Sequence, residues 1–214
     1  MNLNLIESSK VYVIIIIISV LSSLYSFEAF LNYKKNENRS LKLKKELLLE
    51  KENKVYDERT IEQYFRHLSG KNKNVSVAFY PNYFLRENSI FQPLSGVSNS
   101  LTIICNENGY MSTYLSDRFG FNNPNEEWNG GEVEYLIIGD SFAQGSCVNR
   151  PNDIASILRT LTEKKILNLG YGDIGPLFEY AILREYMQKN TKKILWLYYE
   201  GNDQSDLNKE LENE

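Results

Sequence analysis

The last third of this 214-residue chain contains three short apolar runs, and each of them stops at a polar turn that contains glycine. The runs are YLII at 135–138, KILNLG from 165 and KILWLYY at 193–199. Helix-forming segments lie between them, one opening near Pro151 and one with Pro176 near its start. Strands that alternate with helices are typical of a parallel sheet covered on both faces, with right-handed crossovers. The sequence therefore predicts an α/β fold for residues 133–214.

The polar turns at the ends of the three strands hold the candidate chemistry. In order, the turns contain Gly139-Asp140-Ser141, then Asn168 to Asp173, then Gly201-Asn202-Asp203. The carboxyl ends of parallel strands meet at one edge of the sheet, where ligands bind. There we expect Ser141 to attack an acyl carbonyl, while its own N–H, an N–H of the second turn and the Asn202 amide stabilise the oxyanion. Asp140 and Asp203 are expected to cap local backbone N–H groups.

These three segments resemble the SGNH, or GDSL-type, hydrolases. IIGDSFAQG resembles the first block of that family, NLGYGDIGP the second and YYEGND the third, in the family's order. The resemblance covers roughly residues 117 to 208. It implies a flavodoxin-like, three-layer parallel sheet, a serine esterase or O-acyl transferase activity, Ser141 as nucleophile and Asn202 in the oxyanion hole. SDRFGFNNP, before the first strand, is similar to the lead-in of membrane-anchored bacterial members that are associated with acylated surface polysaccharides.

Two positions depart from the family pattern. Asp173 stands where a second block of this kind generally has glycine, so the second oxyanion donor is expected to be the N–H of Asp173 or of Gly172. The family's last block, an Asp-x-x-His segment that supplies the base, has no counterpart, and the sheet is expected to be incomplete. The only histidine, His67, precedes Ser141 by 74 residues and is expected to be a surface or packing residue.

The missing block leaves three hypotheses open. The first is an N-terminal portion of a longer serine esterase or O-acyl transferase that acts on acyl esters of a small molecule or a surface polysaccharide. The second is a catalytically inactive, membrane-anchored binding or scaffold protein. The third is a truncated product without a stable function, because three strands with an uncovered edge bury little apolar surface.

The N-terminus carries an uncharged apolar run, VYVIIIIISVLSSLYSF at 11–27, that continues to Leu31 after Glu28. About 21 helical residues span the ~30 Å of a bilayer core, so we expect a single-pass anchor at residues 1–33 rather than a cleaved signal or a core helix. Basic residues are more frequent after the span than before it, which favours a cytoplasmic domain. The family resemblance instead implies an extracytoplasmic domain, and this is the placement that we expect.

The middle of the chain separates into two segments. Residues 34–69 are rich in Lys, Glu and Leu, which predicts a charged helical stalk with an amphipathic turn set at its end. Residues 70–132 contain two strand-like runs, NVSVAFYP and LTIIC, among turn-forming residues, which predicts a small β-containing lead-in region. Residues 133–214 then form the partial hydrolase-like domain.

Composition excludes several other classes of protein. The net charge of -4, with 24 basic and 28 acidic residues, does not favour nucleic-acid binding. Cys105 and Cys147 lack metal-ligand spacing, and the sequence indicates neither a disulfide framework nor a zinc site. Serine acyl transfer needs no metal or organic cofactor, so none is expected.

Overall fold

The structure, a computed structural model, describes residues 3–51, 56–85 and 91–212. The chain divides into two compact units, Met1–Tyr56 and Asp57–Glu214. The four segments predicted from the sequence are therefore distributed over two units, and their boundaries remain predictions.

The first unit consists of one long helix, α1 (Leu3–Lys51). Within it, Val11–Lys35 is long and apolar enough to cross a membrane, and no side chain of this stretch is buried within the protein. At 1.5 Å per residue, 25 residues extend about 38 Å, which exceeds the ~30 Å of a bilayer core. Length and composition thus allow a membrane span, and helix continues through the first part of the predicted stalk.

The second unit begins with α2 (Ile61–Ser69), which the sequence assigned to the stalk. Thr60 and Gln63 form a reciprocal capping box at its start. A small mixed sheet follows, with β1 (Val75–Val77) parallel and β3 (Thr113–Leu115) antiparallel to the central β2 (Leu101–Ile103). The two predicted strands of the lead-in region are confirmed, and β3 is added to them. Two short 3₁₀ helices, η1 (Pro81–Phe84) and η2 (Asn125–Trp128), lie in the connections.

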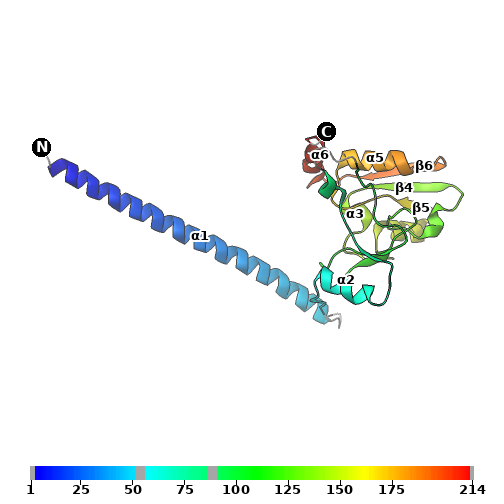
Figure 1. Cartoon of the computed structure of the whole chain (residues 1–214), viewed down its shortest axis with the longest axis horizontal. Coiled ribbons are helices and arrows are strands. Elements are labelled where there is room, and N and C mark those ends of the chain that lie inside the picture. Colours follow the sequence, from blue (N-terminus) through cyan, green and yellow to red (C-terminus); the bar gives the residue numbers. More distant parts are fainter. Residues whose placement is uncertain (1–2, 52–55, 86–90, 213–214) are drawn as a thin grey trace. The chain divides into compact units, whose positions relative to one another are not determined.

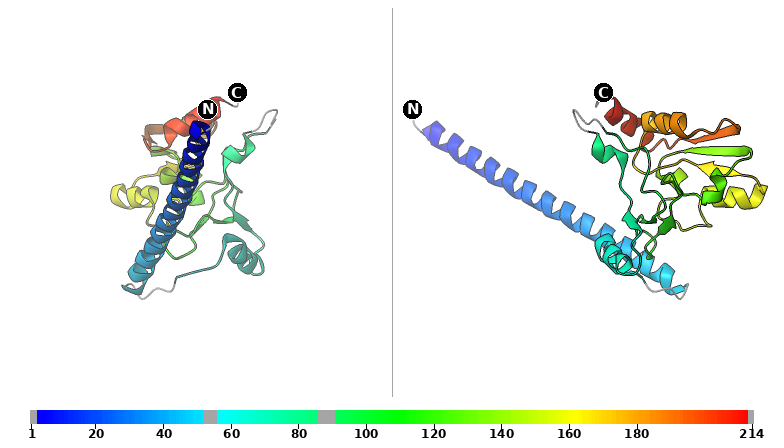
Figure 2. Two further views of the ribbon diagram at one scale, coloured as in Figure 1. Left: turned by 90° about the vertical axis from the view of Figure 1, so that its left-hand side faces the viewer. Right: turned by 45° about the vertical axis from the view of Figure 1, so that its right-hand side comes forward.

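The larger sheet contains the three predicted strands, all parallel, in the order β5-β4-β6. Figures 1 and 2 show these strands side by side. β4 (Val133–Gly139) is central, between β5 (Ile166–Asn168) and β6 (Thr191–Leu197). The helices are α3 (Ser141–Gln144), α4 (Ile154–Thr162), α5 (Pro176–Tyr186) and α6 (Asp203–Leu211). The α/β architecture with a parallel sheet is confirmed.

Apolar layers lie on both faces of β4. Leu136 and Ile138 pack with Phe178 and Ile182 of α5 on one face, whereas Ile137 packs with Ala155 of α4 on the other. The alternation of side chains along the strand directs successive residues to opposite faces. The two crossover helices therefore cover opposite faces of the sheet.

One predicted helix start is wrong. Pro151 does not open a helix, because α4 begins at Ile154 and its N-cap is Asp153. The Asp153 carboxylate accepts a hydrogen bond from the backbone N–H of Ser156. A side-chain cap that satisfies a free N–H sets this helix start.

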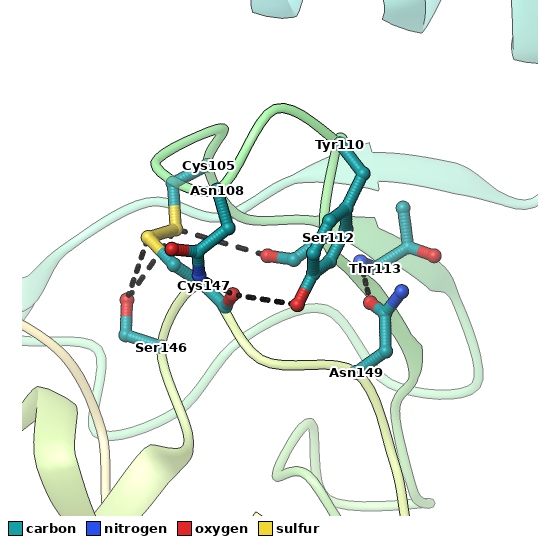
Figure 3. The surroundings of a disulfide bond; sticks show 8 residues. All are labelled: Cys105, Asn108, Tyr110, Ser112, Thr113, Ser146, Cys147 and Asn149. Atoms are coloured by element: carbon teal, nitrogen blue, oxygen red, sulfur yellow. Dashed lines mark hydrogen bonds between the residues drawn. A yellow bond between two sulfur atoms is a disulfide. The ribbon is translucent and has the colours of Figure 1, made fainter. Parts of the chain in front are cut away.

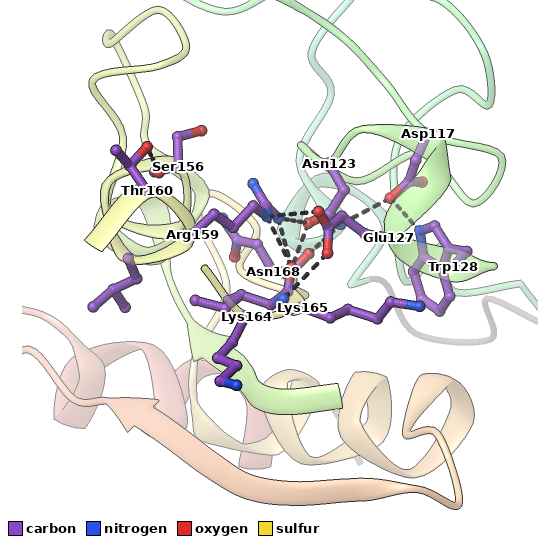
Figure 4. Close-up of polar contacts among 12 residues, drawn as sticks. Asp117, Asn123, Glu127, Trp128, Ser156, Arg159, Thr160, Lys164, Lys165 and Asn168 are labelled. Atoms are coloured by element: carbon purple, nitrogen blue, oxygen red, sulfur yellow. Dashed lines mark hydrogen bonds and ion pairs between the residues drawn. The ribbon is translucent and has the colours of Figure 1, made fainter. Parts of the chain in front are cut away.

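Asn123, in the lead-in to β4, connects that segment to the larger sheet (Figure 4). Its Nδ2 donates to Asp117 Oδ2 and to the Asn168 carbonyl, at 2.8 Å each. Its Oδ1 accepts from the Asn168 N–H at 2.8 Å and from Arg159 Nη2 at 2.6 Å. One buried amide thereby forms hydrogen bonds with four groups from three segments, and these bonds hold the lead-in against β5.

Candidate active site

The turn after β4 places Ser141 at the carboxyl end of the central strand. Gly139 has φ +152°, and a Cβ at this position would lie 2.7 Å from the Leu197 carbonyl oxygen. Asp140 is buried, and its Oδ1 accepts a hydrogen bond from the Phe142 N–H at 2.9 Å, which confirms its predicted capping role. Ser141 is half-buried and opens the short helix α3, which ends at Gln144 and is capped by Gly145. The predicted sharp turn from strand to helix is present.

Ser141 lines a cleft of about 380 Å³. The apolar part of its wall comes from Phe142, Val148 and Ile154. Its polar residues include Glu107 from the small sheet's β2–β3 connection, together with Ser146. The lead-in region therefore contributes directly to the surroundings of the candidate nucleophile, although the sequence suggested no chemistry there.

The second predicted turn lies against α3. The Tyr171 N–H donates to the Gly139 carbonyl at 3.1 Å, which ties this turn to the end of β4. A Cβ on Gly170 would lie 2.4 Å from Ala143 Cβ, and a Cβ on Gly172 would lie 2.5 Å from a ring carbon of Tyr80. Only glycine, which has no Cβ, fits at these two positions.

Asp173 adopts the left-handed conformation, with φ 54°. Partial burial raises the pKa of its carboxyl, and the nearby charge of Asp206 adds to this rise. A left-handed backbone is one that glycine adopts at little cost and aspartate tolerates better than most residues. Asp173 thus adopts the left-handed turn conformation without being glycine. Which N–H would bind an oxyanion, that of Gly172 or that of Asp173, remains a prediction.

The third predicted turn brings Asn202 to the same edge of the sheet. Asn202 Nδ2 donates to Asp140 Oδ2 at 3.3 Å and to Asp206 Oδ2 at 2.8 Å. Because Asp140 precedes Ser141 directly, the ends of β4 and β6 are connected beside the candidate nucleophile. Asp203 is buried and accepts the Tyr199 N–H through Oδ2 at 2.5 Å, as expected of a turn carboxylate.

Buried carboxylates gather behind this edge. Asp203, Asp206, Glu179 and Glu210 are each at most 4% exposed. Burial raises the pKa of Glu179 to about 7, although a hydrogen bond from the Trp196 indole opposes this rise. Burial also raises the pKa values of Asp203 and Glu210, and Glu210 accepts hydrogen bonds from the N–H groups at the start of α5. Among the described residues, no group of three or more His, Cys, Asp or Glu side chains could hold a metal ion.

His67 lies on the exposed surface of α2, and its Nε2 is 3.3 Å from Lys71 Nζ. This agrees with the expected surface role. The one imidazole of the chain therefore contacts Lys71, which follows α2 in the sequence.

Cys105 and Cys147 form a disulfide (Figure 3), although the sequence indicated no disulfide framework. The bond joins the end of β2 to the loop after α3, across 42 residues of sequence. Cys147 and the adjacent Ser146 both line the Ser141 cleft. Two cysteines without a spacing motif carry no local signal, because only the fold brings their Cα atoms to 5.3 Å.

Comparisons of the chain with models of protein families, with characterised proteins and with solved structures find no match.

Proposed function

We propose that this chain is a membrane-anchored serine esterase or O-acyl transferase of the SGNH type, acting on acyl esters such as those of a cell-surface polysaccharide. The observation that carries the proposal is the hydrogen bond from Asn202 to Asp140, the residue before Ser141. It joins the first and third predicted blocks at the carboxyl ends of adjacent parallel strands. A serine on a sharp turn beside backbone and amide donors suits acyl transfer.

The sheet supports the finer fold assignment within this proposal. The order β5-β4-β6, with α4 and α5 on opposite faces, places β4 and β6 at the point where the strand order reverses. In open α/β sheets ligands bind outside the carboxyl ends of strands at such a point. Ser141 and Asn202 follow these two strands directly, in keeping with a flavodoxin-like sheet.

In the proposed reaction, Ser141 Oγ attacks the ester carbonyl carbon and forms a covalent acyl-enzyme. The alcohol leaves, and water or another hydroxyl then takes the acyl group. The carbonyl oxygen carries negative charge during both steps, and N–H groups of Ser141, of the Gly172–Asp173 turn and of Asn202 would stabilise it. Ser141 also needs a proton acceptor, and the family resemblance assigns that role to an Asp-x-x-His segment. His67, on α2, is not given this role.

We also propose that the second unit is extracytoplasmic. The disulfide between Cys105 and Cys147 supports this placement, since disulfides persist in oxidising compartments and are rare in the cytosol. The basic residues that follow the apolar segment argue against it, but large domains are translocated largely regardless of flanking charge. Protease added to intact spheroplasts should digest the second unit, and protection of this unit would contradict the placement.

Covalent labelling tests the enzymatic proposal. The full chain in detergent, treated with a fluorophosphonate, should gain the probe's mass on the peptide that contains Ser141. The Ser141→Ala variant should lose the label. Ser146→Ala is the matched control, because Ser146 lines the same cleft and its variant should still be labelled. Equal labelling of the Ser141→Ala variant, or no labelling of the wild type, would refute the proposal.

A second candidate function is a catalytically inactive binding protein that retains the crevice for an acylated glycan. The observation that favours it is that both hydrogen bonds of the Asn202 amide go to carboxylates. This candidate predicts saturable binding of an acetylated oligosaccharide, measured by calorimetry, without covalent labelling of Ser141. Binding together with labelling would favour the enzyme.

A further inference from the structure

The Asn202 side chain has two amide hydrogens, and both are already used. One hydrogen bond goes to Asp140 Oδ2 at 3.3 Å, and the shorter one goes to Asp206 Oδ2 at 2.8 Å. An amide NH₂ group has only these two donors. An oxyanion beside Ser141 can therefore receive an Asn202 hydrogen bond only if one of the two carboxylates gives it up.

Asp206 is the carboxylate that can lose its hydrogen bond to Asn202 without disturbing the turn that holds Ser141. Asp140 also caps α3 through the Phe142 N–H, so its loss would disturb the turn that holds Ser141. Asp206 lies four residues after Asn202, one turn along α6, and its other oxygen pairs with Lys209 Nζ at 2.6 Å. The Asp206 contact with Asn202 is thus local to α6, whereas the Asp140 contact joins two strands.

The charge of Asp206 acts in the same direction as its hydrogen bond. The side chain is 6% exposed, so water screens its charge weakly. The negative charge of Asp206 contributes to the raised pKa values of Asp173, Asp203 and Glu210, and the Lys209 ammonium, 2.6 Å from the other Asp206 oxygen, offsets part of the field of this charge. A second negative charge, developing on a substrate oxygen, is opposed by the same field.

We propose that Asp206 is a built-in brake on the oxyanion site: it holds one amide hydrogen of Asn202, and its buried charge opposes a second negative charge there. This inference rests on the proposed function and specifies the regulation of the same site. Loss of the Asp206 acceptor, or a movement of α6 that separates it from Asn202, releases the amide hydrogen. Asp140 continues to hold the other hydrogen and thereby keeps the amide beside Ser141.

Labelling rates test the brake. When a fluorophosphonate reacts, the Ser141 Oγ–P bond forms, the P–F bond breaks, fluoride leaves, and the hydroxyl proton passes to water or buffer. The phosphonyl oxygen gains negative charge on the way, as the oxygen of an ester does. Asp206→Asn removes the charge, and Asp206→Ala also removes the acceptor. Each variant should be labelled about tenfold faster than wild type, a modest share of the ~10²–10³ that a single oxyanion donor contributes.

Glu212→Gln is the matched control. It removes the same charge from the end of α6, but at an exposed position, and it should label at the wild-type rate. A second readout follows the amide itself. In ¹⁵N-labelled protein, the side-chain NH₂ resonances of Asn202, identified by their loss in Asn202→Ala, should move upfield in Asp206→Ala because a charge-assisted hydrogen bond is lost.

The outcomes separate this inference from the proposed function. Faster labelling of both Asp206 variants, with shifted Asn202 resonances, supports the brake. Labelling at or below the wild-type rate in the two variants overturns it and leaves the role of Ser141 intact. Unchanged Asn202 resonances overturn it as well. A complete absence of labelling in wild type and in both Asp206 variants refutes the proposed function and the brake together.

Discussion

The two sheets of the second unit are stabilised by different interactions. The small sheet β1-β2-β3 has hydroxyl side chains in its interior: Ser100 Oγ donates to Ser76 Oγ, and Ser116 Oγ donates to the Val97 carbonyl. The larger sheet β5-β4-β6 has apolar layers on both sides of β4. Hydrogen bonds add about 1 kcal/mol each, whereas burial of a large apolar side chain adds ~1.5–3 kcal/mol. We conclude that the larger sheet is the stable core, whereas the small sheet combines buried Ile103 and Tyr114 with these hydrogen bonds and depends more on its cross-links.

Removal of the disulfide should cause the largest loss of stability, and this loss should concern the small sheet. Cys105→Ser combined with Cys147→Ser frees a loop of 42 residues, whose closure is worth about 4 kcal/mol in the chain-entropy description. Thermal unfolding of the full chain should shift to lower temperature. Wild type with dithiothreitol should match the double variant. An unchanged Tm would show that the small sheet does not need this cross-link.

Gly170→Ala tests the packing of the larger sheet. The added methyl group would lie 2.4 Å from Ala143 Cβ and 2.6 Å from the Gln144 backbone nitrogen, so α3 must move. We expect a loss of about 3 kcal/mol in the free energy of unfolding, measured by urea denaturation. Gly130→Ala is the matched control, because nothing lies within 4 Å of the added atom. Equal stability of the two variants would contradict the close contact.

Glu179→Gln tests the acidic end of the larger sheet. The pKa of Glu179 is about 7 in the folded protein, against an ordinary value of 4.5, so the folded state binds more protons between these pH values. Its contribution to stability is fully present below pH 4.5 and is lost as the pH rises through 7. Wild type should lose roughly 3 kcal/mol from this residue between pH 4.5 and 8.

The Glu179→Gln variant should lack this part of the pH dependence, because glutamine does not titrate. Urea unfolding at pH 4.5, 6 and 8 measures the difference between the two proteins. Glu163→Gln, an exposed position, should keep the wild-type dependence. Parallel curves for wild type and Glu179→Gln would show that the Glu179 pKa is not raised by folding.

Ser116→Ala should have the smallest effect and sharpens the description of the small sheet. The buried hydroxyl accepts from the Ser100 N–H at 2.8 Å, and its loss leaves that donor without this partner. The expected loss is about 1 kcal/mol in the free energy of unfolding, from chemical denaturation. Ser98→Ala, which removes an exposed hydroxyl, should have less effect. A larger loss than that of Gly170→Ala would reverse the ranking of the two sheets.

Local patterns predicted the larger sheet well. Its three strands, the helix after Pro176 and the turn at Ser141 all follow from apolar runs that end at polar, glycine-containing segments. The start of α4 was expected near Pro151, whereas the helix begins directly after the Asp153 cap.

The sequence by itself determined the apolar helix at the N-terminus, the α/β alternation and the placement of Ser141 and Asn202 at the ends of strands. These features depend on residues close together in the chain, so local patterns encode them. Only the tertiary structure decided that Cys105 meets Cys147, that Tyr80 packs on Gly172 and that Asn202 binds Asp140 and Asp206. The first three of these four contacts join residues 42 to 92 positions apart, and the last depends on how α6 begins after β6. Such contacts follow from strand order and packing, which no local pattern specifies.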